Sequence, residues 1–167
     1  MAFGTSYEGV KEVTSAVRKV LDKPLIVKLS PNVTDITVTA RAAEDGGADG
    51  ISLINAFTAM VIDIEKRRPV LGNNTGGLSG PGIRPIAVRM TYDVAKTVKI
   101  PVLGIGGIVE GSDAIQFMLA GATAVSIGAG NFYYPDTSVR VINQIEEYLN
   151  KHNIEDINSI IGTVEMN

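Results

Sequence analysis

The residues best suited to chemistry follow short apolar runs that have the composition of β-strands. These positions are Lys28 with Ser30-Pro31-Asn32, Asn55 with Ala56, Gly106-Gly107, and Gly128-Ala129-Gly130. The carboxyl ends of parallel strands meet at one edge of a sheet or at one mouth of a barrel, where ligands bind. We therefore expect these positions to converge on a single site.

Two glycine clusters suit the binding of a phosphate group. They are Gly104-Ile-Gly-Gly107 and Ser126-Ile-Gly-Ala-Gly130, each at the end of a strand-like run. Small residues let backbone N–H groups approach an anion closely, and barrels often bind phosphate after their last two strands. Either cluster alone is equally well explained as a tight turn. Their occurrence at two successive strand ends favours a phosphate site.

Lys28 and Asn55 are the polar side chains that could recognise a ligand at the same edge. Lys28 lies in an apolar run that predicts a buried strand, and a buried ammonium is costly unless it is paired. The functional interpretation is a cation beside a cofactor or substrate oxygen, and the alternative is a structural ion pair. Asn55 offers both a donor and an acceptor to a heterocycle, although Asn at a strand end also commonly forms a turn.

Composition excludes several classes of function. The chain has 167 residues, 45% hydrophobic and 20% charged, with a net charge of −3 and no cysteine. We therefore expect an ordinary globular protein that binds neither nucleic acid nor membrane and is located in the cytoplasm. No metal site is expected. The charge run 63–68 is predicted to be a solvated loop or hairpin with internal ion pairs, and His152 a surface residue.

The spacing of apolar residues predicts alternating helices and strands. Helices are expected over 7–21, 35–45, 83–98, 112–119, 139–149 and 154–161, and strands over 25–29, 50–54, 101–105 and 124–127. Residues 55–81 are expected to be a long irregular segment over the site. The pattern α(βα)₄ predicts an α/β fold with parallel strands.

Four such units correspond to half of a (β/α)₈ TIM barrel, which typically needs about 250 residues. Residues 1–167 are therefore predicted to form a single domain, a partial TIM barrel that lacks the N-terminal half. A doubly wound four-stranded sheet is the structural alternative.

Three segments carry a specific family resemblance. They are Val27-Lys-Leu-Ser-Pro-Asn-Val-Thr-Asp-Ile36, then Asn73-Asn-Thr-Gly-Gly-Leu-Ser-Gly-Pro81 with Arg84-Pro85, and finally Gly106-Gly-Ile108 followed by Asp113-Ala114 and Ala120-Gly-Ala122. Their order and spacing resemble the C-terminal half of class 1B dihydroorotate dehydrogenase along nearly the whole chain.

This resemblance implies a (β/α)₈ barrel that binds FMN and oxidises dihydroorotate to orotate in pyrimidine biosynthesis. It also implies a partner subunit with FAD and a [2Fe–2S] cluster that passes electrons to NAD⁺, and a homo-oligomer at full length. The implied cofactor-binding residues are Lys28, Ile54, Gly80, Gly106, Gly107, Gly128 and Ala129, and the implied substrate-binding residues are Asn55 and Ala56.

The chain departs from the family pattern at three points. Ala56 and Ala129 replace the family's usual Thr, so two hydroxyl contacts are expected to be lost. The family's catalytic base, a Cys, is expected upstream of Met1, so no catalytic residue is assigned here and this chain alone is expected to be inactive. One alternative is a non-catalytic half barrel that binds FMN or the partner. Another is a different phosphate-binding barrel enzyme.

Overall fold

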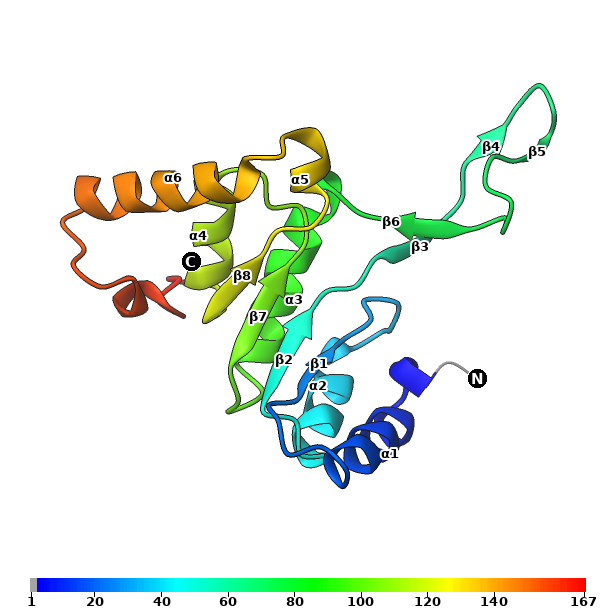
Figure 1. The fold of residues 1–167 in the computed structure, drawn as a ribbon, viewed down its shortest axis with the longest axis horizontal. Coiled ribbons are helices and arrows are strands. Elements are labelled where there is room, and N and C mark those ends of the chain that lie inside the picture. Colours follow the sequence, from blue (N-terminus) through cyan, green and yellow to red (C-terminus); the bar gives the residue numbers. More distant parts are fainter. Residues whose placement is uncertain (1–2) are drawn as a thin grey trace.

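A four-stranded parallel sheet forms the centre of the molecule in a computed structural model, which describes residues 3–167. The strand order is β1-β2-β7-β8, so each strand lies beside the next one of the series (Figure 1). The strands are β1 (Ile26–Lys28), β2 (Gly50–Leu53), β7 (Val102–Ile105) and β8 (Ala124–Ser126). All three pairings are parallel, which brings the carboxyl ends of the four strands to one edge.

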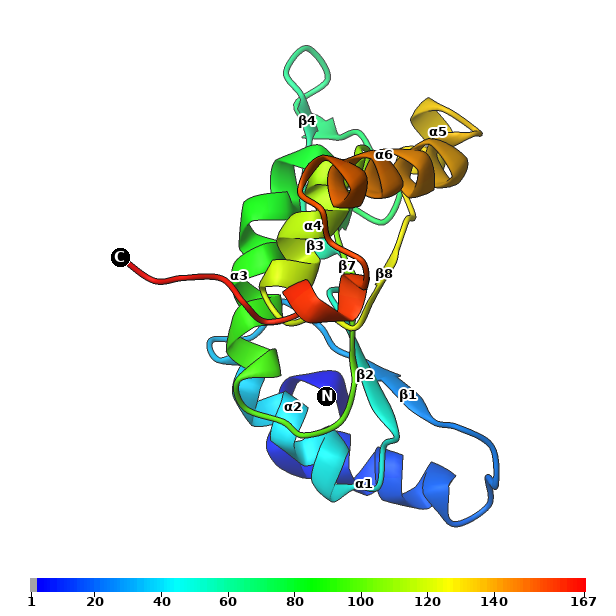
Figure 2. The same cartoon turned by 90° about the vertical axis from the view of Figure 1, so that its left-hand side faces the viewer.

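Helices cover one face of this sheet. Figure 2 shows α2 (Ile36–Asp45), α3 (Arg84–Ala95) and α4 (Gly111–Leu119) on the same side of the strands, with α1 (Tyr7–Arg18) beside α2 and α6 (Thr137–Lys151) beside α4. The remaining helical elements are short: α5 (Gly130–Tyr133) and the 3₁₀ turns η1 (Phe3–Thr5), η2 (Pro81–Ile83) and η3 (Ile157–Ile160). The predicted α(βα)₄ pattern is confirmed.

The strand order also distinguishes between the two folds that the sequence allowed, the half barrel and the doubly wound sheet. A doubly wound sheet carries helices on both faces and reverses its strand order at a switch point. Within residues 3–167 this sheet has a sequential order and helices on one face only, as in half of a (β/α)₈ barrel. The doubly wound alternative is therefore wrong, and no helix of the described residues covers the other face.

The hydrophobic core lies between the sheet and its helices. Ile51 and Leu53 of β2 are fully buried against Val94 of α3 and the core around Phe117 of α4. Phe117 packs directly on the backbone of Gly104, where an added Cβ would lie 2.5 Å from the ring. The glycine in β7 is therefore required by this close packing.

The strand predicted over 25–29 differs from expectation in its environment. We expected burial on both faces, but Ile26 and Lys28 are exposed in β1. The reason is that, in the part of the chain that the structure describes, β1 is an edge strand paired with β2 alone and no helix covers its second face. The prediction of a doubly buried strand is wrong at this position.

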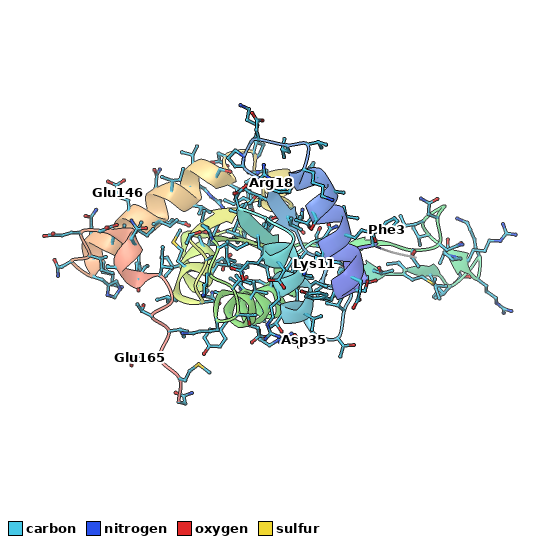
Figure 3. All side chains as sticks on the ribbon, turned by 90° about the horizontal axis from the view of Figure 1, so that it is seen from below. Phe3, Lys11, Arg18, Asp35, Glu146 and Glu165 are labelled. Carbon is cyan, nitrogen blue, oxygen red and sulfur yellow. The ribbon has the colours of Figure 1, made fainter. Side chains whose placement is uncertain are left out.

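The segment predicted to be irregular over 55–81 forms a two-part β-arm. Strand β3 (Phe57–Ala59) pairs with β6 (Gly76–Leu78), and β4 (Ile62–Asp63) pairs with β5 (Arg68–Pro69), both antiparallel. The arm projects away from the carboxyl edge of the sheet (Figures 1 and 3). Strands of two or three residues are too short for a periodic pattern, so the sequence did not predict them.

Helix α6 begins and ends within two residues of its predicted bounds, whereas α1, predicted over 7–21, and α3, predicted over 83–98, each end three residues early. The helix predicted over 154–161 is only the short 3₁₀ turn η3. Side-chain caps set two of the helix starts: Ser6 accepts a hydrogen bond from the Gly9 N–H at the start of α1, and Asp35 accepts one from the Thr37 N–H at the start of α2. Within residues 3–167, no helix is long and apolar enough to cross a membrane.

Candidate functional site

A cavity of about 210 Å³ opens at the carboxyl edge of the sheet. Every residue that the sequence assigned to cofactor or substrate lines it. The lining residues are Lys28, Ile54, Asn55, Ala56, Ser79, Gly80, Ile83, Ile105, Gly106, Gly107, Gly128 and Ala129. The structure thus brings these predicted positions together, while their individual roles stay predictions. Ser30, Pro31, Asn32 and Gly130, which were also expected at this edge, do not line the cavity.

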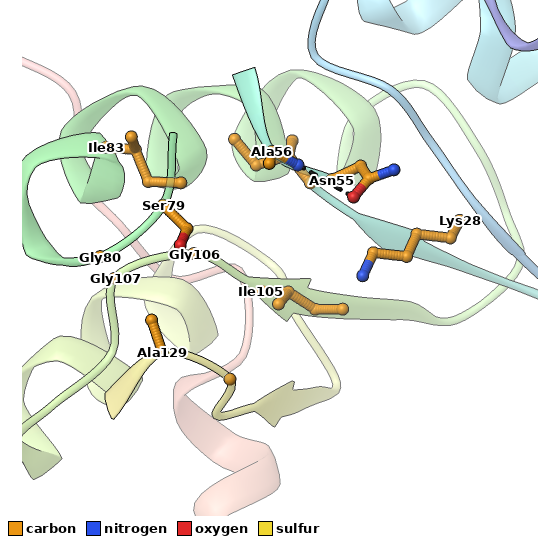
Figure 4. A pocket seen from close by; sticks show the side chains of 12 residues that line it. Lys28, Asn55, Ala56, Ser79, Gly80, Ile83, Ile105, Gly106, Gly107 and Ala129 are labelled. Atoms are coloured by element: carbon orange, nitrogen blue, oxygen red, sulfur yellow. Dashed lines mark hydrogen bonds between the residues drawn. The ribbon is translucent and has the colours of Figure 1, made fainter. Parts of the chain in front are cut away.

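The cavity has two chemically different ends (Figure 4). Lys28 and Asn55, from neighbouring strands, lie at one end, and Gly80, Gly107 and Ala129 lie at the other. The Ile105 side chain lies between them. A ligand with a polar ring and a distant anionic group would match this arrangement.

Strand register explains why the two ends face one cavity. Lys28 pairs with Ser52, Leu53 with Gly104, and Ile105 with Ser126. Backbone hydrogen bonds continue the ladder beyond the strand ends, since the Ile54 N–H donates to Ile105 O at 2.8 Å. The residues that follow each strand are therefore held at one level.

Lys28 differs from the prediction in its burial. The side chain was expected to leave a buried strand and to need a counter-ion, but it is exposed and forms no ion pair within the described residues. The open sheet face beside β1 leaves the ammonium in contact with solvent. Lys28 can therefore offer its charge to a ligand without first breaking a salt bridge.

The Asn32 side chain holds the backbone that follows Asn55. The Asn32 side-chain amide donates to Ala56 O at 3.1 Å, and its oxygen accepts from the Thr58 N–H at 2.9 Å. The Asn55 oxygen accepts from the Ala56 N–H at 2.9 Å, as in a local turn. The turn-forming interpretation of Asn55 therefore holds for its oxygen, and its NH₂ group is the part available to a ligand.

The glycine end of the cavity presents backbone N–H groups. Among the hydrogen bonds of residues 3–167, none uses the N–H of Gly107, Gly128 or Ala129 as donor. An added Cβ at Gly128 would meet nothing within 4 Å, so the backbone there faces open space. Lys28 is the only ionisable residue of the lining, and no carboxylate opposes an anion. This end can bind a phosphate.

Sequence reasoning missed three lining residues, Ser79, Ile83 and Ile105. Ile105 ends β7 directly before Gly106, so its position at a strand end was a usable signal. Ser79 precedes Gly80 in a quoted motif. Ile83 is buried behind the cavity, and no sequence pattern distinguishes it from an ordinary core residue.

The other charged and polar candidates lie outside the cavity, as predicted. Asp63 forms an ion pair with Lys66 at 3.1 Å within the β4–β5 hairpin. His152 is exposed at the end of α6 and lies beside Tyr148, with ring centroids 4.4 Å apart. Residues 3–167 contain no group of three or more His, Asp or Glu side chains that could hold a metal ion.

Comparison with known proteins identifies the family. The family model described as dihydroorotate dehydrogenase matches residues 1–149. The chain belongs to the dihydroorotate dehydrogenase family. A relative from Geobacter sp. (strain M21), named "Dihydroorotate dehydrogenase B (NAD(+)), catalytic subunit", is 54% identical over 166 residues, covering 99% of this chain and 54% of the relative. A relative of the same name from Brachyspira hyodysenteriae is 58% identical over 167 residues.

Solved structures of dihydroorotate dehydrogenase share the fold. A crystal structure of DHODH from Eimeria tenella in complex with ferulenol superposes with a TM-score of 0.79 at 24% identity, covering 95% of this chain and 48% of that one. The ligand-free form from the same organism has a TM-score of 0.78. The chain spans about half the length of the curated relatives it matches.

Proposed function

We propose that this chain is the FMN-binding half barrel of an NAD-linked dihydroorotate dehydrogenase catalytic subunit. In the complete protein, dihydroorotate is oxidised to orotate in pyrimidine biosynthesis, and electrons pass to NAD⁺ through a partner subunit with FAD and a [2Fe–2S] cluster. The observation that carries the proposal is one cavity, which joins a cation and an amide at one end to free backbone N–H groups at the other.

The residues present fit FMN. The glycine end offers donors without protein acceptors to the phosphate, and Ile54 and Ile105 offer apolar surface to a flat ring. The cavity of about 210 Å³ is smaller than the ~300–1,000 Å³ usual for ligand pockets. The half barrel therefore supplies one wall of the site, and further surface must complete it.

When bound, FMN supplies the two-electron acceptor for the oxidation. Lys28 would stabilise negative charge at the ring end, because its ammonium lies beside that part of the cavity and has no competing ion pair. The Asn55 NH₂ group would orient a substrate carbonyl, and the Ala56 backbone, held by Asn32, would line the same subsite.

A proton acceptor is missing from the lining. Lys28 is its only ionisable residue, and its charge suits stabilisation rather than proton removal. Dihydroorotate oxidation requires a base, which the family resemblance assigns to a Cys. This absence favours the second candidate function, a half barrel that binds FMN or the partner subunit without turnover, for the chain acting alone.

Two measurements test the proposal. Titration of FMN followed by quenching of flavin fluorescence measures binding, and anaerobic addition of dihydroorotate followed by flavin absorbance measures reduction. We expect residues 1–167 to bind FMN without being reduced. A protein that also contains the Cys-bearing segment is expected to do both. Absence of FMN binding in that longer protein, with tight binding of a sugar phosphate instead, would support a different phosphate-binding barrel enzyme.

A further inference from the structure

The glycine end of the cavity is built by two segments from different parts of the chain. One is Ser79-Gly80, before α3, and the other is Gly106-Gly107, after β7. They touch directly, since an added Cβ at Gly107 would lie 2.7 Å from Gly80 O and 3.1 Å from Pro81 Cα. The placement of the Gly107 N–H therefore depends on how these two segments are held together.

An ion pair joins α3 and α4, the helices that follow these two segments. Arg84 is the first residue of α3, and its guanidinium lies 2.7 Å from Asp113 Oδ1 in the first turn of α4. The second carboxylate oxygen, Oδ2, accepts hydrogen bonds from the Val109 N–H at 3.0 Å and the Glu110 N–H at 3.1 Å. Asp113 thus connects α3 to the loop that carries Gly106-Gly107.

The burial of this pair distinguishes it from an ordinary surface salt bridge. The Asp113 side chain is only 5% exposed and that of Arg84 is 28% exposed. A buried pair contributes little net stability compared with apolar residues, but loss of one partner leaves an uncompensated charge. Neither residue lines the cavity. Their effect on a ligand must therefore act through the backbone they hold.

We propose that Arg84 and Asp113 are positioning residues for the phosphate end of the cavity. Their ion pair holds Gly80 and Gly107 in contact, so that the Gly107 N–H stays aimed at the anion. This proposal rests on the proposed function, because it takes FMN as the ligand. It predicts an effect on FMN, which carries a phosphate, and little effect on riboflavin, which lacks one.

The variant Arg84→Gln in the full chain tests this role. We expect its dissociation constant for FMN, measured by flavin fluorescence quenching, to rise by about tenfold or more, while that for riboflavin changes by less than about twofold. Arg84→Lys should restore part of the FMN affinity. The double variant Arg84→Gln/Asp113→Asn should lose less FMN binding free energy than the sum of the losses in the two single variants, because both changes remove the same interaction.

Arg89→Gln is the matched control. Arg89 pairs with Asp93 on the exposed side of the same helix, so its loss should leave both dissociation constants unchanged. Equal losses of FMN and riboflavin affinity in Arg84→Gln would overturn the proposal, because a general weakening of the fold affects both ligands alike. An unchanged FMN affinity would overturn it as well.

Amide hydrogen exchange without ligand keeps the test independent of FMN. In Arg84→Gln the amides of Val109 and Glu110, which donate to Asp113, should exchange faster than in the unaltered chain, while those at the far end of α3 stay protected. Unchanged protection of these two amides overturns the positioning role even if FMN binds. Failure of the unaltered full chain to bind FMN overturns the proposed function, and the positioning role with it.

Discussion

Lys28 is the residue whose charge the proposed chemistry uses most directly. In the longer protein that also contains the Cys-bearing segment, Lys28→Ala is expected to slow flavin reduction by dihydroorotate by about 10²–10³-fold, the usual effect of removing one electrostatic stabiliser. The free energy of unfolding should stay the same, because the side chain is exposed and unpaired within residues 3–167. Rapid-mixing absorbance measures the reduction rate. Lys66→Ala, in the β4–β5 hairpin, is the control, and an unchanged rate in Lys28→Ala would remove the assigned role.

Gly107 is the residue whose backbone the phosphate end depends on. Its φ of +75° and the 2.7 Å contact that a Cβ would make with Gly80 O both disfavour a side chain. Gly107→Ala should therefore destabilise the fold by at least about 1–2 kcal/mol and weaken FMN binding. Denaturant unfolding and fluorescence titration measure the two effects. Gly82→Ala, where a Cβ meets nothing within 4 Å, should change neither, and equal effects of both variants would contradict this reasoning.

At the scale of single elements, the contact between α4 and β7 carries much of the core. Phe117 is fully buried and packs on Gly104. Phe117→Ala should lower the free energy of unfolding by about 3–5 kcal/mol, since it removes a large apolar side chain and leaves a cavity. Phe132→Ala is the control, because Phe132 is 94% exposed and its loss should matter by less than about 0.5 kcal/mol. Urea unfolding measures the free energy of unfolding of both variants, and equal losses would contradict this prediction.

The end of α1 is joined to the start of the sheet by Asp49. Its carboxylate accepts a hydrogen bond from the Leu25 N–H and pairs with Arg18, both at 2.7 Å. The Leu25 hydrogen bond, with a smaller contribution from Arg18, holds the pKa of Asp49 below the ordinary value of 3.8. Since the folded pKa is lowered, this stabilisation is present above pH 3.8 and is lost as pH falls through the lowered pKa.

Comparing Asp49→Asn with the unaltered chain tests this linkage. The variant should be less stable near neutral pH, and the difference should shrink as the pH falls below the ordinary aspartate value, because protonation removes the same charge. Denaturant midpoints across this pH range measure it. Asp22→Asn, which changes a carboxylate 87% exposed, is the control. A difference that stays constant with pH would show that the charge of Asp49 is not involved.

At the scale of the whole molecule, the sheet ends in two open edges. Among the described residues, 3–167, strands β1 and β8 each pair on one side only, and no helix covers the face opposite α2, α3 and α4. Open parallel edges and apolar surface promote association. Residues 1–167 by themselves should therefore self-associate in sedimentation velocity experiments.

A charged residue placed on β1 tests whether this open edge causes the self-association. Ile26→Lys changes a side chain of β1 that is 56% exposed, and it should shift the chain toward monomer. Val20→Lys changes an exposed residue outside the sheet and should have no such effect. Equal behaviour of the two variants would place the association surface elsewhere on the molecule.

Much of the fold and of the candidate site could be predicted because both depend on local patterns. Apolar spacing predicted α2, α4 and the four main strands to within one or two residues at each end. Strand-end positions predicted seven of the twelve lining residues, since parallel strands bring their carboxyl ends together. The arm between Phe57 and Leu78 was missed because its strands are too short to show a period.

The sequence by itself determined the order of the main helices and strands, the family and nine of the twelve residues that line the cavity. Only the tertiary structure decided that Lys28 is exposed, that the helices cover a single face, and that Arg84 pairs with Asp113. The physical reason is the distance along the chain over which each interaction acts. Periodicity and turn chemistry act between near neighbours in the chain, whereas burial and ion pairing depend on which distant segments the completed sheet brings into contact.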